Sequence, residues 1–335
     1  MARPRLGPGE KGNYNVSRNE KAKRSLRKKI STQGKEQEKL QTKVRAKKNN
    51  KREAENALNI LENGGLLKGE IADNLPPTVK EAINEGSDIA FQPNDGPQTE
   101  FLASPEKEVL YGGAAGGGKS YAMLMDLLRY ADNVNHRALL LRRTLPELTE
   151  LIDKSKQIYP KAFPRARFKE STKTWEFPSG ATALFSYVDK DDDVYRYQGQ
   201  SFTWIGIDEL GHYPTPYVWN YLRSRLRTTD PKIETYMRAS SNPGGAGGWW
   251  VKKMFVDPTP PANPFWATDI ETGKVLKYGM SHARSGEPLF QRKFIPARLT
   301  DNPHLARDGE YEAMLLSLPE VERKRLLSGD WDVAE

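Results

Sequence analysis

The sequence contains no cysteine, and this absence excludes disulfide bonds and metal sites built from thiolates. It also has no apolar run near the ~20 residues that a membrane-spanning helix needs, so we expect no membrane segment. The start, Met1–Asn19, is polar and basic and lacks the apolar stretch of a secretory leader. The 4 histidines show no ligand spacing, which favours structural or solvent-facing roles over a zinc site. We therefore expect a soluble protein without signs of secretion.

Positive charge is concentrated at the N-terminus. Residues 1–52 contain 18 Lys and Arg against 4 Asp and Glu, whereas the whole chain has 52 and 44. The tail thus carries a balance of +14 and the rest of the chain −6, which together give the net charge of +8. Such a tail has too few apolar residues to build a core, and its basic runs suit sequence-independent attraction to nucleic-acid phosphates. The alternative is a solvated, partly helical arm without a partner.

Composition divides the chain into four parts. We predict a basic, partly helical or disordered tail over residues 1–63, a Gly- and Pro-punctuated linker over 64–77, a core over 78–255 and a C-terminal lid subdomain over 256–335. In the core, apolar strand-like runs alternate with helical stretches, which is typical of an α/β fold with a mostly parallel sheet flanked by helices. The expected strands are Glu108–Tyr111, Arg137–Leu141, Phe202–Ile207 and Ile233–Ser240.

Two further segments depart from this alternation. Residues Arg167–Tyr187 are rich in Thr, Phe and Trp and are interrupted by Pro178-Ser179-Gly180, which predicts a β-hairpin elaboration of the sheet. After residue 255, Pro-rich loops alternate with three short expected elements, the strand Lys293–Ala297 and the helices Gly309–Ser317 and Pro319–Leu327.

The most specific motif is Gly-Ala-Ala-Gly-Gly-Gly-Lys-Ser, which matches the phosphate-binding loop G-x-x-x-x-G-K-[ST] between an apolar strand and a helix. In such a loop the backbone N–H groups and the helix N-terminus face phosphate oxygens. Lys119 is expected to reach the β- and γ-phosphates, and the Ser120 hydroxyl to join a Mg²⁺ shell. The alternative is a Gly-rich turn that happens to end in Lys-Ser. The predicted nucleotide-binding residues are Gly113, Ala114, Ala115, Gly116, Gly117, Gly118, Lys119 and Ser120.

Two polar groups follow later strands. Asp208 and Glu209 end the apolar run Phe202–Ile207, where an acid is expected to hold Mg²⁺ and a second acid to activate water as a general base. Asn242 follows the strand that ends near Ser240 and can contact the γ-phosphate or the attacking water. Taken alone, the acid pair can be structural and Asn242 can cap a tight turn. Their position after a complete phosphate loop favours a nucleotide hydrolase.

These runs, with the late Gly329-Asp330-Trp331-Asp332, resemble the ATPase half of a large terminase subunit from a tailed bacteriophage. The resemblance runs from about Phe91 to the C-terminus, and the basic tail lies outside it. Gly96–Phe101 resembles the adenine-recognition segment of the family, in which Gln98 would read the base. Leu140–Thr144 resembles the arginine motif after the second strand.

The resemblance implies a RecA-like P-loop ATPase of the additional-catalytic-glutamate type that uses ATP and Mg²⁺. It implies ATP-driven translocation of double-stranded DNA into a procapsid, with the portal protein and the small terminase subunit as partners and a homo-oligomeric ring on the portal. The expected location is the host cytoplasm, with transient docking on the procapsid portal and absence from the mature virion. Arg142 is the first candidate, and Arg143 the second, for an arginine that stabilises transition-state charge in cis or in trans. Their alternative is a surface pair at a strand end.

One departure from the family concerns DNA cleavage. Large terminases usually continue past Gly329–Asp332 into an RNase H-like nuclease domain, whereas this sequence stops at Glu335. The acidic run Asp189–Asp193 is interpreted as an exposed loop rather than a two-metal site, so no nuclease activity is expected from this chain. Two rival functions stay open, which are another nucleic-acid translocase or helicase, and a nucleotide-gated DNA-binding assembly factor with little turnover.

Overall fold

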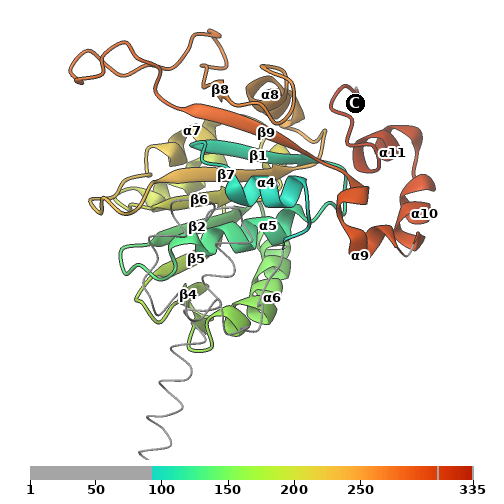
Figure 1. The fold of residues 1–335 in the computed structure, drawn as a ribbon, viewed down its shortest axis with the longest axis horizontal. Coiled ribbons are helices and arrows are strands. Elements are labelled where there is room, and N and C mark those ends of the chain that lie inside the picture. Colours follow the sequence, from blue (N-terminus) through green and yellow to red (C-terminus); the bar gives the residue numbers. More distant parts are fainter. Residues whose placement is uncertain (1–92, 308, 334–335) are drawn as a thin grey trace, which may run out of the picture. The chain divides into compact units, whose positions relative to one another are not determined.

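The computed structural model describes residues 93–307 and 309–333, and the predicted tail and linker lie outside them. The described chain forms a nine-stranded sheet in the order β3-β4-β5-β2-β6-β7-β1-β9-β8 (Figure 1). The strands are β1 Glu108–Gly113, β2 Arg137–Arg142, β3 Arg167–Lys169, β4 Thr174–Glu176, β5 Thr182–Tyr187, β6 Trp204–Ile207, β7 Tyr236–Ser241, β8 Phe265–Trp266 and β9 Gln291–Ala297.

Helices connect these strands. The α-helices are α4 Pro97–Ala103, α5 Lys119–Asp126, α6 Leu145–Ala162, α7 Tyr217–Arg223, α8 Gly248–Val251, α9 Pro303–Ala306, α10 Glu310–Leu316 and α11 Glu320–Leu326. Shorter turns of 3-10 or π geometry are η1 Leu127–Tyr130, η2 Asp191–Tyr197, η3 Leu210–His212, η4 Lys252–Val256 and η5 Leu299–Asp301. Among the described helices, none is long and apolar enough to cross a membrane.

The centre of the sheet is parallel. Strand β2 pairs in parallel with β5 and β6, β7 pairs in parallel with β6 and β1, and β9 continues the parallel order beside β1. Antiparallel pairing is confined to the edges, where β3, β4 and β8 lie. Because parallel strands begin and end at common edges, the loops after β1, β2, β6 and β7 are brought to one edge of the sheet.

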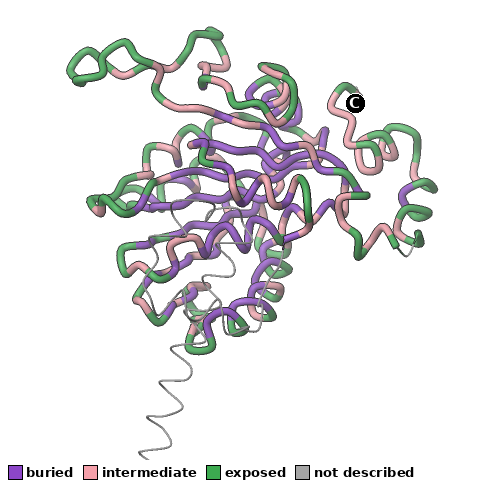
Figure 2. Tube along the Cα trace, viewed as in Figure 1, coloured by how far each residue is buried: buried purple, intermediate pink, exposed green. Residues whose placement is uncertain are grey.

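Both faces of this sheet are buried, as a parallel sheet requires. Successive residues of a strand point to opposite faces. In the run Leu139-Leu140-Leu141, Leu140 belongs to the core cluster that includes residues of α5 and α6, whereas Leu139 and Leu141 belong to the cluster that includes residues of α7 and α8. Figure 2 shows buried residues along the central strands and largely exposed residues in α9–α11. The loops thus follow the carboxyl ends of strands that are buried on both faces of the sheet.

The predicted fold class is confirmed, with two refinements. The hairpin predicted in Arg167–Tyr187 comprises β3 and β4, but its last part is β5, which enters the parallel sheet beside β2. The second refinement concerns the boundary predicted at residue 255, because the sheet continues past it with β8 and β9. The helices α9, α10 and α11, which follow β9, lie beside the end of the sheet (Figure 1).

Candidate nucleotide site at the carboxyl edge of the sheet

The glycine-rich loop joins β1 to α5, as the motif predicts. Gly113, Gly116 and Gly118 all have positive φ angles, of 137°, 76° and 78°, which glycine adopts without strain. At Gly113 a Cβ atom would lie 2.3 Å from the carbonyl oxygen of Ala297 in β9. The sequence of this loop is therefore set both by its backbone angles and by its close approach to the neighbouring strand.

Other parts of the chain hold the loop from the outside. The N–H of Ala114 donates to the Ala297 carbonyl at 2.8 Å, and the N–H of Ala115 donates to the carbonyl of Leu326 in α11 at 2.7 Å. The Tyr111 hydroxyl donates to the Gly117 carbonyl at 2.9 Å, and the Asn302 side chain donates to the Gly116 carbonyl at 2.7 Å. These four hydrogen bonds tie the loop to β9, α11, Tyr111 and the segment after β9.

Lys119 lies at the start of α5 and is buried. Its Nζ atom donates to the Ala114 carbonyl at 2.6 Å and to Oδ1 of Asn242 at 2.7 Å. Burial lowers the pKa of Lys119, and the nearby carboxylates of Glu209 and Asp208 oppose that effect. Two residues 123 positions apart thus meet beside the loop, and contact of Asn242 with a γ-phosphate or water stays a prediction.

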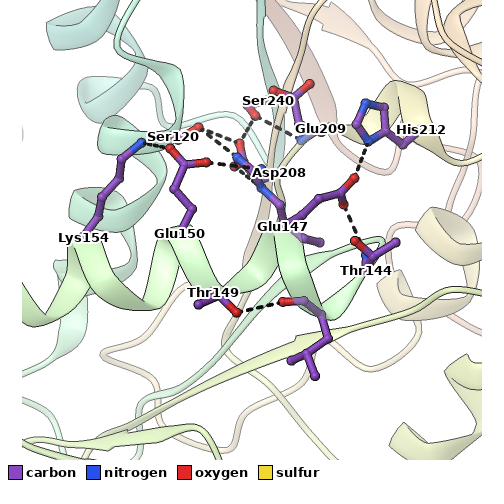
Figure 3. A network of polar contacts seen from close by, with 12 residues as sticks. Ser120, Thr144, Glu147, Thr149, Glu150, Lys154, Asp208, Glu209, His212 and Ser240 are labelled. Atoms are coloured by element: carbon purple, nitrogen blue, oxygen red, sulfur yellow. Dashed lines mark hydrogen bonds and ion pairs between the residues drawn. The ribbon is translucent and has the colours of Figure 1, made fainter.

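Asp208 follows β6 and is fully buried. Its Oδ1 atom accepts hydrogen bonds from the hydroxyls of Ser240 and, at 3.3 Å, Ser120 (Figure 3). Its Oδ2 atom accepts from Nε and Nη2 of Arg142 at 2.8 and 2.5 Å. Asp208 is therefore the point at which the loop, β2, β6 and β7 converge.

Glu209 is the next residue and has φ +59°, a left-handed conformation that is uncommon for residues other than glycine. It lines a cavity with Lys119 and Asn242. Burial and the adjacent Asp208 raise the pKa of Glu209, while Lys119 and Arg142 act in the opposite direction. Strained backbone and a carboxylate with a raised pKa often occur together at catalytic sites.

The two candidate arginines have different surroundings. Arg142, at the end of β2, is 8% exposed and is bound to Asp208 of its own chain. Arg143 turns away from Asp208: its Nη1 donates to the carbonyl of His212 at 2.5 Å, and its Nε lies 3.9 Å from Asp189. Arg143 thereby ties β2 to the η3 turn that follows Glu209.

Gln98 lies in α4 beside the glycine loop. Its Oε1 atom accepts from the N–H of Asn94 at 2.7 Å, and its Nε2 atom donates to the Gly118 carbonyl at 3.1 Å. Both Gln98 and Asn94 line the cavity. The base-reading role of Gln98 stays a prediction.

The cavity has a volume of about 990 Å³, at the upper end of the range for small-molecule sites. Part of its wall was not predicted from the sequence. Glu150 and Lys154 of α6 line it, as do Asn302, His304, Leu305 and Tyr311 from the segment after β9. These residues belong to no motif, and only the fold brings them to the glycine loop. The acidic run Asp189–Asp193, in contrast, is not part of this wall and leads into η2.

The strand order, the loop and the cavity define a P-loop protein of the RecA-like class. A family model for the terminase large subunit, T4likevirus-type, N-terminal, matches residues 110–325, and the chain belongs to this family. The resemblance found in the sequence to the ATPase portion of a large terminase is thus confirmed. A search of curated proteins finds no significant relative.

Solved structures of phage large terminases are also similar to this chain. The large terminase from a thermophilic bacteriophage matches with a TM-score of 0.50 at 15% identity, over 72% of this chain and 54% of that one. The ATPase domain of the large terminase from Thermus phage P74-26 matches with a TM-score of 0.48 at 13% identity, over 72% and 94%. The chain therefore spans about half the length of the first of these two terminases.

Proposed function

We propose that this chain hydrolyses ATP and couples hydrolysis to the movement of double-stranded DNA, as the ATPase part of a phage large terminase subunit. The proposal rests on functional groups from different parts of the chain that lie at one place. Lys119 donates to Asn242, and Ser120, the next residue, donates to Asp208, so groups that follow three different strands meet beside one cavity. Glu209 lines the same cavity and supplies a carboxylate for water activation.

In this mechanism the glycine loop and Lys119 bind the β- and γ-phosphates. Ser120 Oγ and Asp208 Oδ1, which lie 3.3 Å apart, are hard oxygen donors that suit Mg²⁺ when phosphate oxygens and water complete its shell. The ion, when bound, neutralises charge on the phosphates. Glu209 accepts a proton from the attacking water, and Asn242, bound to Lys119, lies where it can contact the γ-phosphate.

Gln98 is proposed to read the adenine edge from its place beside Gly118. For the transition-state arginine, the contacts favour Arg142 acting in cis, because it is buried against Asp208 of its own chain. The bond of Arg143 to the His212 carbonyl favours a structural role for that residue. From family membership we propose that the chain forms a homo-oligomeric ring on the portal and has the small terminase subunit as a partner. We also propose that it stays in the host cytoplasm until packaging ends.

We further propose that the lid comprises the helices α9–α11, which follow the last strand of the sheet. The basic tail is proposed to add nonspecific attraction to duplex DNA. That this chain does not cut DNA stays a prediction, which plasmid nicking with Mg²⁺ or Mn²⁺ would test.

Steady-state phosphate release with and without duplex DNA tests the proposed function. We expect turnover that duplex DNA stimulates and that Lys119→Ala abolishes together with nucleotide binding, because this lysine acts in the ground state. Unwinding of a forked duplex would instead favour a helicase. Nucleotide binding without turnover would favour a nucleotide-gated assembly factor.

A further inference from the structure

Arg142 is held between two carboxylates of different kinds. Its Nε and Nη2 atoms contact Asp208, which is fully buried. Its Nη1 atom lies 3.9 Å from Oε2 of Glu150, whose side chain is 58% exposed. The guanidinium thus bridges the floor of the site and the helix α6 at its rim.

The contacts of Arg142 coincide with the groups expected to hold magnesium. Nη2 lies 2.5 Å from Asp208 Oδ2 and 3.5 Å from Ser120 Oγ. A guanidinium and a divalent ion at one carboxylate repel each other, because both are positively charged and a partly buried site screens them less than water does. A magnesium ion at Asp208 Oδ1 would therefore weaken the hold of Oδ2 on Arg142.

Glu150 is the second carboxylate that can pair with the Arg142 guanidinium. It projects from the face of α6 opposite the buried residues Leu148, Leu151 and Ile152, and it lines the cavity. Lys154, one turn further along, donates to Glu150 Oε1 at 2.6 Å (Figure 3). This hydrogen bond, with help from Arg142, lowers the pKa of Glu150, so the carboxylate is charged at neutral pH. Lys154 occupies one oxygen of Glu150 and leaves the other toward Arg142.

We propose that Glu150 is a positioning residue for Arg142. When Asp208 binds magnesium, Glu150 becomes the main ion-pair partner of the Arg142 guanidinium. This pairing keeps Arg142 beside the phosphates and out of solvent. Lys154 fixes the Glu150 rotamer from the far side. This inference rests on the proposed ATPase function, and it adds a residue that belongs to no sequence motif.

The test measures the Mg²⁺ concentration needed for tight binding of a fluorescent, non-hydrolysable ATP analogue. The key variant is Glu150→Gln, which keeps shape and removes charge. Its matched control is Asp153→Asn, because Asp153 is exposed on the same helix but does not line the cavity. Arg142→Gln and the double variant Arg142→Gln/Glu150→Gln complete a double-mutant cycle. Thermal unfolding of each variant checks the fold.

For Glu150→Gln we expect about a 2- to 10-fold rise in the required Mg²⁺ concentration, the size typical of coupled neighbouring residues. Asp153→Asn should leave it unchanged. Arg142→Gln should lower the required concentration, because Asp208 loses a competing cation. In that background Glu150→Gln should have no further effect. For turnover, Glu150→Gln should lower kcat with little change in analogue affinity at saturating Mg²⁺.

Three results would overturn the proposal. These are unchanged Mg²⁺ dependence in Glu150→Gln, an equal change in Asp153→Asn, or the same effect of Glu150→Gln with and without Arg142. The first two outcomes are decisive even if Arg142→Gln does not fold. Because the analogue is not hydrolysed, the cycle can be read whether or not the wild-type chain turns over ATP. Absence of wild-type phosphate release would contradict the proposed function instead.

Discussion

The start and the end of strand β1 both lie beside buried charge, but the two places are built differently. At the start, Glu108 is fully buried, and its two carboxylate oxygens pair with Arg223 and Arg292. Arg292 is 1% exposed, and neither Glu108 nor Arg292 lines the nucleotide cavity. At the end, the glycine loop leads to Lys119, which faces that cavity together with Glu209.

The pKa values of Glu108 and Glu209 are shifted in opposite directions. Burial alone would raise the pKa of Glu108, but Arg223 and Arg292 outweigh burial, and the pKa is lowered. For Glu209, burial and the neighbouring Asp208 outweigh the cations, and the pKa is raised. Buried charge by itself therefore does not mark a functional site. A partly buried acid whose charge is poorly compensated, and which lines a cavity, is the better indicator of a functional site.

Glu108→Gln should have the largest effect on stability. It leaves two arginines near the start of β1 without a counter-charge, and breaking a buried pair in this way typically costs about 3–5 kcal/mol. Urea unfolding should show this loss, whereas Glu209→Gln should change the free energy of unfolding by less than about 1 kcal/mol or raise it slightly. Equal losses in the two variants would erase the contrast between the two ends of β1.

A smaller effect is expected for Gly329, which packs under the glycine loop. Its φ is +65°, and a Cβ atom there would lie 2.6 Å from the backbone nitrogen of Ala114. Gly273 has φ +66° with open space around it and serves as the control. Both Gly→Ala variants should lose about 1 kcal/mol through backbone strain. Only Gly329→Ala should also weaken ATP binding, and equal ATP affinity in the two variants would show that the loop tolerates the shift.

The smallest effect concerns pH. Because folding lowers the pKa of Glu108, its stabilising contribution is present above the ordinary value of 4.5 and is lost as pH falls through the lowered pKa. Because folding raises the pKa of Glu209, stability falls as pH rises from 4.5 through the raised pKa. In Glu108→Gln, the loss of stability at acidic pH should disappear from the plot of stability against pH. In Glu209→Gln, the fall in stability as pH rises above 4.5 should disappear. Unchanged profiles would show that neither glutamate is perturbed.

Motifs and strand patterns were sufficient to predict most of the fold. The run Leu139-Leu140-Leu141 is buried on both sides, which is what a parallel strand requires, and the glycine loop fixes where β1 ends. The position of β9 could not be predicted, because its pairing with β1 joins residues about 184 apart. Local patterns carry no information on which strands become neighbours.

The same limit applies to the candidate site. Lys119, Asp208, Glu209 and Asn242 were predicted because each follows a strand in a recognisable motif. Glu150 gave no signal, since on its own it is an ordinary exposed glutamate in a helix. Its proximity to Arg142 arises from the capping of α6 directly after β2, where Glu147 accepts from the Thr144 N–H at 3.2 Å. The turn between β2 and α6 therefore places Glu150, in the first turns of α6, at the wall of the cavity.

The most direct test of the central claim is to compare nucleotide binding with turnover in Glu209→Gln. If Glu209 activates water at a site built by Lys119, Ser120 and Asp208, this variant should bind ATP with the wild-type Kd. Its rate of phosphate release should fall by about 10²–10⁴-fold, the usual contribution of a general base. Phosphate release at the wild-type rate would contradict the assignment of Glu209 and with it the proposed hydrolytic site.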